Sequence, residues 1–178
     1  MAEFFRFPHT PHLAWLGKDQ PRDDKVMTPA EVAEILARPI TVEEKVDGAN
    51  VGISVDEHGD LCAQNRGSYL TRESCHPQFK PLFRWLDERR GALEDALFPD
   101  LMLFGEWCYA VHSVAYDRLP DWFLAFDVFD RAAGKFWSVP RRDALVRQLG
   151  LALIPRLADG RFQLAEFPGL LGRSRLAD

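Results

Sequence analysis

The sequence lacks the features that mark membrane-spanning, secreted or broadly nucleic-acid-binding proteins. No stretch approaches the roughly 18 consecutive apolar residues of a membrane span. The N-terminus, MAEFFRFPHT, has an acidic residue and no apolar run with a small-residue cleavage site. Its 22 Lys and Arg residues stand against 27 Asp and Glu, and the net charge of −5 argues against a broad basic surface. We therefore expect a cytoplasmic protein without membrane contact, in which any contact with nucleic acid is local.

Cysteine is also scarce. Cys62, Cys75 and Cys108 are odd in number and lack the paired spacing of a zinc site. They also lack the density of a disulfide scaffold. We expect free, mostly buried thiols and no cysteine metal site.

What the sequence does have is enough apolar material for one core. At 178 residues and 47% hydrophobic, it is predicted to form a single domain over residues 1–178. Pro8, Pro11 and Pro21 predict an irregular lead-in over the first 25 residues.

Helices and strands are predicted in a mixed order. Thr28, Pro29 and Glu31 form a capping-box pattern that opens a helix over residues 29–38. Amphipathic spacing predicts a second helix over 81–97, with a weak point at Gly91, and a third is expected over 141–150. Predicted strands cover 40–46, 51–55, 61–65, 101–107, 122–130, 135–139 and 151–157. This mixture favours an α+β fold with mainly antiparallel sheets and flanking helices.

The segment TVEEKVDG, residues 41–48, ends a predicted strand in a lysine. A surface strand often carries a lysine that discourages edge pairing. Alternatively, Lys45 is a nucleophile. Strict alternation places it on one face with Glu43 and Asp47. Because those carboxylates favour the charged ammonium, a nucleophilic lysine here needs desolvation or a nearby divalent cation.

Three more polar residues lie at or near predicted strand ends. Arg66 precedes Gly67, Glu106 follows an apolar run, and Asp127 lies within an aromatic strand beside Phe126. Taken singly, such charged residues are more often solvated or structural. Together with Lys45 they supply an amine, carboxylates, a guanidinium and an aromatic face. A nucleoside triphosphate with its metal requires such groups.

These segments resemble a known family. EKVDGAN matches the K-x-D-G signature of the covalent nucleotidyltransferases, which include ATP-dependent DNA and RNA ligases and mRNA capping enzymes. The segments QNRGSY, LFGEW and FLAFDVFD resemble later blocks of that group in the same order. DDKV and FPHTPHLAWLG resemble the lead-in of bacterial RNA ligase-like proteins. The chain is most similar to the RNA ligase branch, over nearly its whole length.

The resemblance implies a mechanism and a site. Lys45 would attack the α-phosphorus of ATP and hold AMP, which would pass to an RNA 5′-phosphate before a 3′-hydroxyl seals the strands. Mg²⁺ would accompany ATP, near Glu106 and Asp127. The nucleotide-binding residues implied by the family are Glu44, Val46, Asp47, Gly48, Asn50, Arg66, Glu106 and Phe126.

The sequence departs from the family pattern near its end. Family members continue to an E-G-[VI] block and a K-x-K-like block, and neither follows the aromatic strand here. Of five lysines, only Lys80 and Lys135 come after Lys45. The domain is therefore expected to be C-terminally incomplete. Two alternatives stay open: a truncated, non-catalytic nucleotide- or RNA-binding module, and a capping-type guanylyltransferase.

Overall fold

The computed structural model describes residues 4–17 and 25–177. The chain divides into two compact units. Unit 1 consists of Met1–Arg6, Lys45–Ile154 and Arg175–Asp178, and unit 2 of Phe7–Glu44 and Pro155–Ser174. The single domain expected over 1–178 stays a prediction.

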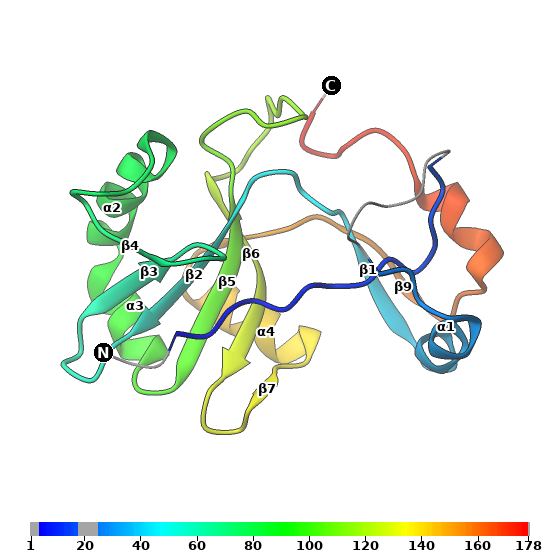
Figure 1. Cartoon of the computed structure of the whole chain (residues 1–178), viewed down its shortest axis with the longest axis horizontal. Coiled ribbons are helices and arrows are strands. Elements are labelled where there is room, and N and C mark those ends of the chain that lie inside the picture. Colours follow the sequence, from blue (N-terminus) through cyan, green and yellow to red (C-terminus); the bar gives the residue numbers. More distant parts are fainter. Residues whose placement is uncertain (1–3, 18–24, 178) are drawn as a thin grey trace. The chain divides into compact units, whose positions relative to one another are not determined.

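Unit 1 is built on one large sheet. Its strands follow the order β4 (Tyr69–Leu70), β3 (Leu61–Gln64), β2 (Ala49–Val55), β5 (Leu101–Trp107), β6 (Phe123–Asp130) and β7 (Lys135–Phe136). These neighbours are all antiparallel, whereas β8 (Ala152–Leu153) lies parallel to β6. Figure 1 shows β2, β5 and β6 side by side through the middle of the sheet. The predicted α+β class with mainly antiparallel sheets is confirmed.

The β2–β3 hairpin was predicted from its turn residues. Asp56 accepts hydrogen bonds at its Oδ1 from the backbone N–H groups of His58 (2.9 Å) and Asp60 (3.1 Å). Gly59 has a φ of 88°, a conformation that costs glycine little. The sequence DEHGD therefore closes the turn by local bonds alone.

Helices and a short 3₁₀ turn complete unit 1. They are η1 (Pro77–Phe79), α2 (Lys80–Asp87), α3 (Arg90–Leu97) and α4 (Val139–Gln148). The single helix predicted over 81–97 is wrong, because the chain leaves the helix at Arg89, whose φ is −121°. Its guanidinium donates to the Trp85 carbonyl and to Asp121. These contacts divide the helix, and Gly91 lies inside α3.

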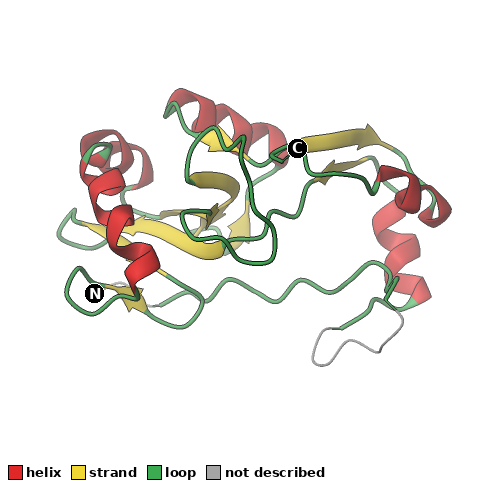
Figure 2. Ribbon diagram, turned by 90° about the horizontal axis from the view of Figure 1, so that it is seen from above, coloured by secondary structure: helices red, strands yellow, loops and turns green. Residues whose placement is uncertain are grey.

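The helices cover one face of the sheet (Figures 1 and 2). The apolar side chains from the strands on this face include Val51, Ile53, Leu103, Trp107 and Phe123, which pack with Leu82, Leu86, Leu93, Leu97 and Val146 of the helices. On the other face the Phe5 ring stacks on Phe129, with centroids 3.8 Å apart, and the Phe5 carbonyl accepts from Gln64 Nε2 at 2.6 Å. Asn50 and Glu106 lie directly opposite each other in the pairing of β2 with β5. Their side chains therefore share the sheet face that is opposite the main core.

Unit 2 contains α1 (Pro29–Leu36), the antiparallel pair β1 (Ile40–Glu43) and β9 (Arg156–Gly160), and η2 (Leu164–Leu170). The capping box predicted at the start of α1 is present: the Glu31 amide donates to the Thr28 hydroxyl at 3.3 Å, and the Thr28 amide donates to the Glu31 carboxylate at 2.7 Å. The strand predicted over 40–46 ends at Glu43, after an irregularity in its pairing. The strand predicted over 151–157 is divided between β8 and β9.

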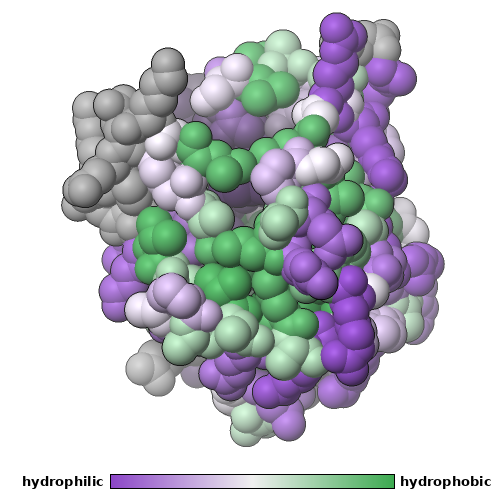
Figure 3. Space-filling view, turned by 90° about the vertical axis from the view of Figure 1, so that its right-hand side faces the viewer, coloured by the Kyte–Doolittle hydropathy of each residue, from purple (hydrophilic) through white to green (hydrophobic). Residues whose placement is uncertain are grey.

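Few apolar side chains are buried in unit 2. Among its described residues only Phe7 and Val32 are buried in this way. Its large apolar side chains that stay exposed are Trp15, Leu16, Val26, Ile35, Leu164 and Leu171. Figure 3 shows apolar side chains gathered between polar ones on one face of the molecule. Unit 2 therefore has a much smaller core than unit 1.

The lead-in and the thiols were predicted with partial success. Residues 4–17 form neither helix nor strand apart from a bridge between His12 and Val26. Pro21 and the first half of DDKV lie outside the described residues. All three cysteines are free, but only Cys108 is fully buried. In the part of the chain that the structure describes, no helix has the length and apolar character needed to cross a membrane.

A substitution at Gly105 tests the packing at the centre of the sheet. A Cβ there would lie 2.4 Å from the Phe123 ring and 2.7 Å from the Leu124 carbonyl oxygen. We expect Gly105→Ala to lower the free energy of unfolding by about 1–3 kcal/mol or more, because the backbone cannot retreat. Urea denaturation measures this.

Gly91→Ala is the matched control, since nothing lies within 4 Å of the added Cβ and the residue is inside α3. It should stabilise the protein by about 0.5–1 kcal/mol. Equal stability of the two variants would contradict the packing described at Gly105.

Candidate active site

A cavity of about 420 Å³ opens beside the segment that follows β1. It lies within unit 1. Its lining comes from the K-x-D-G segment, the start of β2, the turn after β3, the residue before α2, and β5. The lining residues are Lys45, Val46, Asp47, Gly48, Ala49, Asn50, Asn65, Arg66, Gly67, Phe79 and Glu106.

Lys45 is exposed at the cavity, and the residue beside it is an anchor. The Val46 side chain is only 2% exposed and packs with Cys108, Leu124 and Leu176. Removing a valine side chain from water is favourable by about 1.5–3 kcal/mol. Val46, which occupies position x of the K-x-D-G signature, therefore holds the backbone next to the lysine against the sheet.

Asp47 ties the same segment to the loop between β5 and β6. Its Oδ2 accepts from the Ser113 amide at 2.7 Å, and its own amide donates to the Tyr116 hydroxyl at 2.7 Å. The hydrogen bond from the Ser113 amide is the largest of the causes that lower the pKa of the Asp47 carboxyl from its ordinary value. Asp47 is therefore a structural anion that connects the lysine segment with the loop.

Gly48 is required by a close approach to β5. A Cβ at this position would lie 2.8 Å from the Trp107 carbonyl oxygen and 3.1 Å from Cys108 Sγ. Burial raises the pKa of the Cys108 thiol to about 12, and the charges of Glu106 and Asp47 contribute. The thiol is thus protonated and unreactive at neutral pH.

Arg66 is presented by a turn. Asn65 Oδ1 accepts hydrogen bonds from the backbone amides of Gly67 and Ser68, both at 2.8 Å. The backbone amide of Asn65 donates to the Ser68 carbonyl. Asparagine side chains stabilise turns in this way. The turn exposes the Arg66 side chain at the cavity, where its planar guanidinium can bind a phosphate or carboxylate.

Asn50 and Glu106 are paired directly across β2 and β5. Asn50 Nδ2 and Glu106 Oε2 are both buried without a hydrogen-bond partner among the described residues. An unpaired buried polar group costs about 1–3 kcal/mol. One donor and one acceptor therefore face the cavity side by side, a combination that a ligand hydroxyl satisfies.

Burial also sets the protonation of Glu106. It raises the pKa of this carboxyl to about 7, against the nearby charges of Lys45 and Arg66, which lower it, and with a smaller contribution from Asp47 in the raising direction. The carboxyl is thus divided between its neutral and ionised forms near neutral pH. Such shifts in a concave site are typical of functional residues.

Seven of the residues predicted for the site meet at this cavity, namely Lys45, Val46, Asp47, Gly48, Asn50, Arg66 and Glu106. Glu44, Phe126 and Asp127 are not among the lining residues. In unit 2 the Glu44 amide donates to the Pro155 carbonyl at 2.8 Å, and its carboxylate accepts from the Ser174 hydroxyl. Lys45 does not belong to β1, so strand alternation does not define the face on which it lies.

Phe126 and Asp127 lie one strand away, at an irregularity of β6. Asp127 pairs with Phe104, and Gly105 pairs with Ala125, so Phe126 is the extra residue of a β-bulge. Both residues are half-buried, between the buried Ala125 and Val128. The bulge shifts Asp127 onto the sheet face that carries Glu106.

Four lining residues were missed from the sequence: Ala49, Asn65, Gly67 and Phe79. Three of them are next to predicted residues, and the Asn-x-Gly turn pattern gives a usable signal for Asn65 and Gly67. Phe79 gives none, because it is 4% exposed and belongs to the main core. Only the tertiary fold brings it to the cavity.

The cavity offers little to a metal ion by itself. In the described part of the chain, no three His, Cys, Asp or Glu side chains are grouped as a metal site. Mg²⁺, however, is usually held by one or two carboxylates together with water and substrate phosphates. The unpaired Oε2 of Glu106 fits that kind of site.

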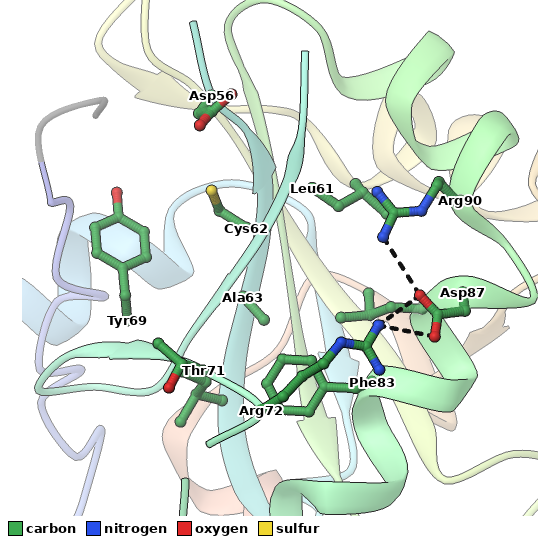
Figure 4. Close-up of a pocket in the computed structure, with 12 residues that line it drawn as sticks. Asp56, Leu61, Cys62, Ala63, Tyr69, Thr71, Arg72, Phe83, Asp87 and Arg90 are labelled. Atoms are coloured by element: carbon green, nitrogen blue, oxygen red, sulfur yellow. Dashed lines mark hydrogen bonds and ion pairs between the residues drawn. The ribbon is translucent and has the colours of Figure 1, made fainter. Parts of the chain in front are cut away.

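A second cavity, of about 290 Å³, differs in its polar groups. It lies between β3, β4 and α2 in unit 1. Figure 4 shows Arg72 and Arg90 both directed at Asp87, which Arg72 binds at 2.6 and 2.8 Å and Arg90 at 3.3 Å. These charged groups have partners, whereas in the first cavity Asn50 Nδ2 and Glu106 Oε2 have none among the described residues. The first cavity is therefore the candidate site.

Comparison with known families agrees with this geometry. The family model described as RNA ligase matches residues 38–170. The match covers most of the sequence, so the chain belongs to the RNA ligase family, as the motifs predicted. A comparison with curated proteins found no significant match.

Solved RNA ligases share the fold. A lysine-to-alanine mutant of Naegleria gruberi RNA ligase, determined with ATP and Mn, superposes with a TM-score of 0.61 at 17% identity, covering 75% of this chain and 41% of that one. Another Naegleria gruberi RNA ligase mutant, without ligand, gives 0.62 at 19% identity, covering 75% and 40%. An archaeal ATP-dependent RNA ligase gives 0.52 at 23% identity, covering 72% and 33%. The chain thus spans less than half the length of these ligases.

The protonation of Glu106 predicts how stability depends on pH. Its pKa is about 7 in the folded protein and about 4.5 in the unfolded chain, so the folded state binds more protons between these values. The free energy of unfolding should therefore fall as pH rises from about 4.5 to 7. We expect the unsubstituted protein to lose about 1–3 kcal/mol relative to Glu106→Gln across this range.

Urea titrations at pH 4.5 and 8, in EDTA, measure the difference. Glu34→Gln, on the exposed surface of α1, is the control and should follow the unsubstituted protein. A Glu106→Gln variant with the same pH dependence as the unsubstituted chain would contradict burial of an ionisable Glu106.

Proposed function

We propose that this chain is the nucleotide-binding part of an ATP-dependent RNA ligase. In the first step Lys45 Nζ attacks the α-phosphorus of ATP. An N–P bond forms, the bond to the pyrophosphate oxygen breaks, and the amine proton passes to solvent. The product is AMP held on Lys45 as a phosphoramidate, so one difficult reaction is divided into easier ones.

The cavity residues have distinct roles in this step. Arg66 binds phosphate oxygens, and the paired groups of Asn50 and Glu106 bind the ribose hydroxyls. Val46, Asp47 and Gly48 hold the backbone that presents the lysine. Phe126 stacks on adenine from the neighbouring strand, and Glu44 fixes the chain that leads into the signature.

Mg²⁺ fits the site as a partner of the triphosphate. Glu106 and Asp127 share one face of the sheet and are the carboxylates that would hold it, directly or through water. When bound, it screens the phosphate charges and favours the unprotonated amine. Glu106, with its unpaired oxygen, serves either the ribose or this metal shell.

The later steps involve RNA ends. AMP passes from Lys45 to an RNA 5′-phosphate, and a 3′-hydroxyl then displaces AMP and joins the strands. A local contact with RNA suits a chain of net charge −5. The expected compartment is the cytoplasm.

One observation carries the proposal: Lys45, Arg66 and the unpaired polar atoms of Asn50 and Glu106 line the same cavity. A surface lysine that only discourages edge pairing would have no reason to share a cavity with a carboxyl of raised pKa and an orphaned amide. The chain's membership of the RNA ligase family supports the same chemistry.

Incubation with α-labelled ATP or GTP, followed by denaturing electrophoresis, tests the proposal. A label that survives denaturation with ATP supports an RNA ligase-type lysine. A preference for GTP would favour a capping-type guanylyltransferase. Reversible binding without a covalent label would favour a non-catalytic nucleotide- or RNA-binding module.

Replacing Lys45 by arginine should abolish the label. Arginine keeps the positive charge but stays protonated in proteins, so it cannot act as the nucleophile. Because Lys45 is exposed, we expect thermal stability to change little. The labelling assay and a thermal melt measure the two effects.

Lys80→Arg is the matched control, because Lys80 is also exposed and lies outside the cavity. It should label like the unsubstituted protein. Full labelling of Lys45→Arg would refute the nucleophile assignment.

A further inference from the structure

The bulge in β6 has a side chain from α4 attached to its backbone. Arg142 Nη1 donates to the carbonyl oxygen of Phe126 at 2.5 Å. Phe126 is the residue that has no counterpart on β5. The carbonyl of its neighbour Ala125 is bound by a different segment, since it accepts from the Ile154 amide at 3.1 Å. Two successive carbonyls at the bulge are therefore held by separate elements.

The guanidinium that binds the bulge is itself fixed. Arg142 is only 2% exposed and Asp143 is also 2% exposed. Nε and Nη2 of Arg142 donate to Asp143 Oδ1 at 2.9 and 2.7 Å. Arg147, one turn further along α4, donates to Asp143 Oδ2 at 3.3 Å. The planar guanidinium of Arg142 binds the Asp143 carboxylate and the Phe126 carbonyl at the same time. Because Asp143 fixes the guanidinium, the Phe126 carbonyl has little freedom to move.

Arg142 and Asp143 form a buried ion pair on α4. A buried ion pair is often no more stabilising than an apolar pair of similar size. The pair on α4 makes no contribution to the lining of the candidate site. Arg142 of this pair contacts the backbone of Phe126, the aromatic residue that the family motifs direct at the base.

We propose that Arg142, oriented by Asp143, is a positioning residue for nucleotide base recognition. By holding the carbonyl of Phe126 it fixes the bulge, and the bulge fixes the direction of the Phe126 ring. This proposal rests on the proposed function, in which Phe126 stacks on adenine. Arg142 and Asp143 touch neither substrate nor reacting atoms, so their effect is restricted to ligands that carry a base.

The test compares ATP with inorganic tripolyphosphate, which lacks the base, in calorimetric titrations of the full chain. The main variant is Arg142→Met with Asp143→Leu, which removes both members of the buried pair and leaves no unpaired buried charge, since Arg147 is 67% exposed. A second variant, Arg142→Lys, keeps the charge and loses the fork. We expect both to bind ATP about fivefold or more weakly, since stacking on one base is worth about that or more. Binding of tripolyphosphate should not change.

Arg147→Met is the matched control, because Arg147 contacts Asp143 from a side chain that is 67% exposed. It should bind both ligands normally. Adding Phe126→Ala to the main variant should weaken ATP binding no further than Phe126→Ala alone, since both changes remove the same contact.

Equal losses for ATP and tripolyphosphate would assign Arg142 a general structural role and overturn the proposal. Additive losses with Phe126→Ala, or full ATP affinity of Phe126→Ala alone, would also overturn it. None of these outcomes decides whether the unsubstituted chain is labelled at Lys45, which is the test of the proposed function. Absence of ATP binding by the unsubstituted chain would overturn both.

Discussion

The candidate site depends on the pairing of β2 with β5. In that register Asn50 lies opposite Glu106, and the chain just before β2 comes so close to the end of β5 that only a glycine fits at position 48. A shift of one residue would turn Asn50 and Glu106 toward the helices, where neither could be satisfied. The same pairing therefore fixes the position of Lys45 and leaves two polar atoms for a ligand.

The same pairing leaves the site with polar groups that lower the free energy of unfolding. The orphaned atoms and the partly neutral Glu106 each cost free energy in the unliganded protein. The cost is offset nearby by burial of Val46 and by the bonds that Ser113 and Tyr116 make with Asp47. Val46 and Asp47 thus anchor the lysine segment beside a cavity in which two polar atoms have no partner among the described residues, as expected of a site organised before its ligand arrives.

Local signals in the sequence predicted what local physics decides. The capping box at Thr28, the DEHGD turn and the apolar strands 101–107 and 122–130 all follow from neighbouring residues, and all are present. The break between α2 and α3 was misplaced because Arg89 binds Asp121, which is 32 positions away. Strand alternation could not place Lys45, because β1 ends at Glu43. Seven residues predicted from the motif segments line the cavity, whereas Phe79 reaches it by tertiary packing that no local pattern reveals.

The charges of the cavity explain why the proposed ligand needs a cation. Lys45 and Arg66 supply two positive groups, while Asp47 is ionised and Glu106 is divided between its two forms near neutral pH. A triphosphate brings several negative charges into this nearly balanced setting, so the protein alone cannot neutralise it. A divalent cation bound with the phosphates would also draw Glu106 toward its ionised form, because a positive charge favours the carboxylate. In the proposed function, binding of nucleotide and cation would thus be linked to the charge on Glu106, whose pKa is raised by burial.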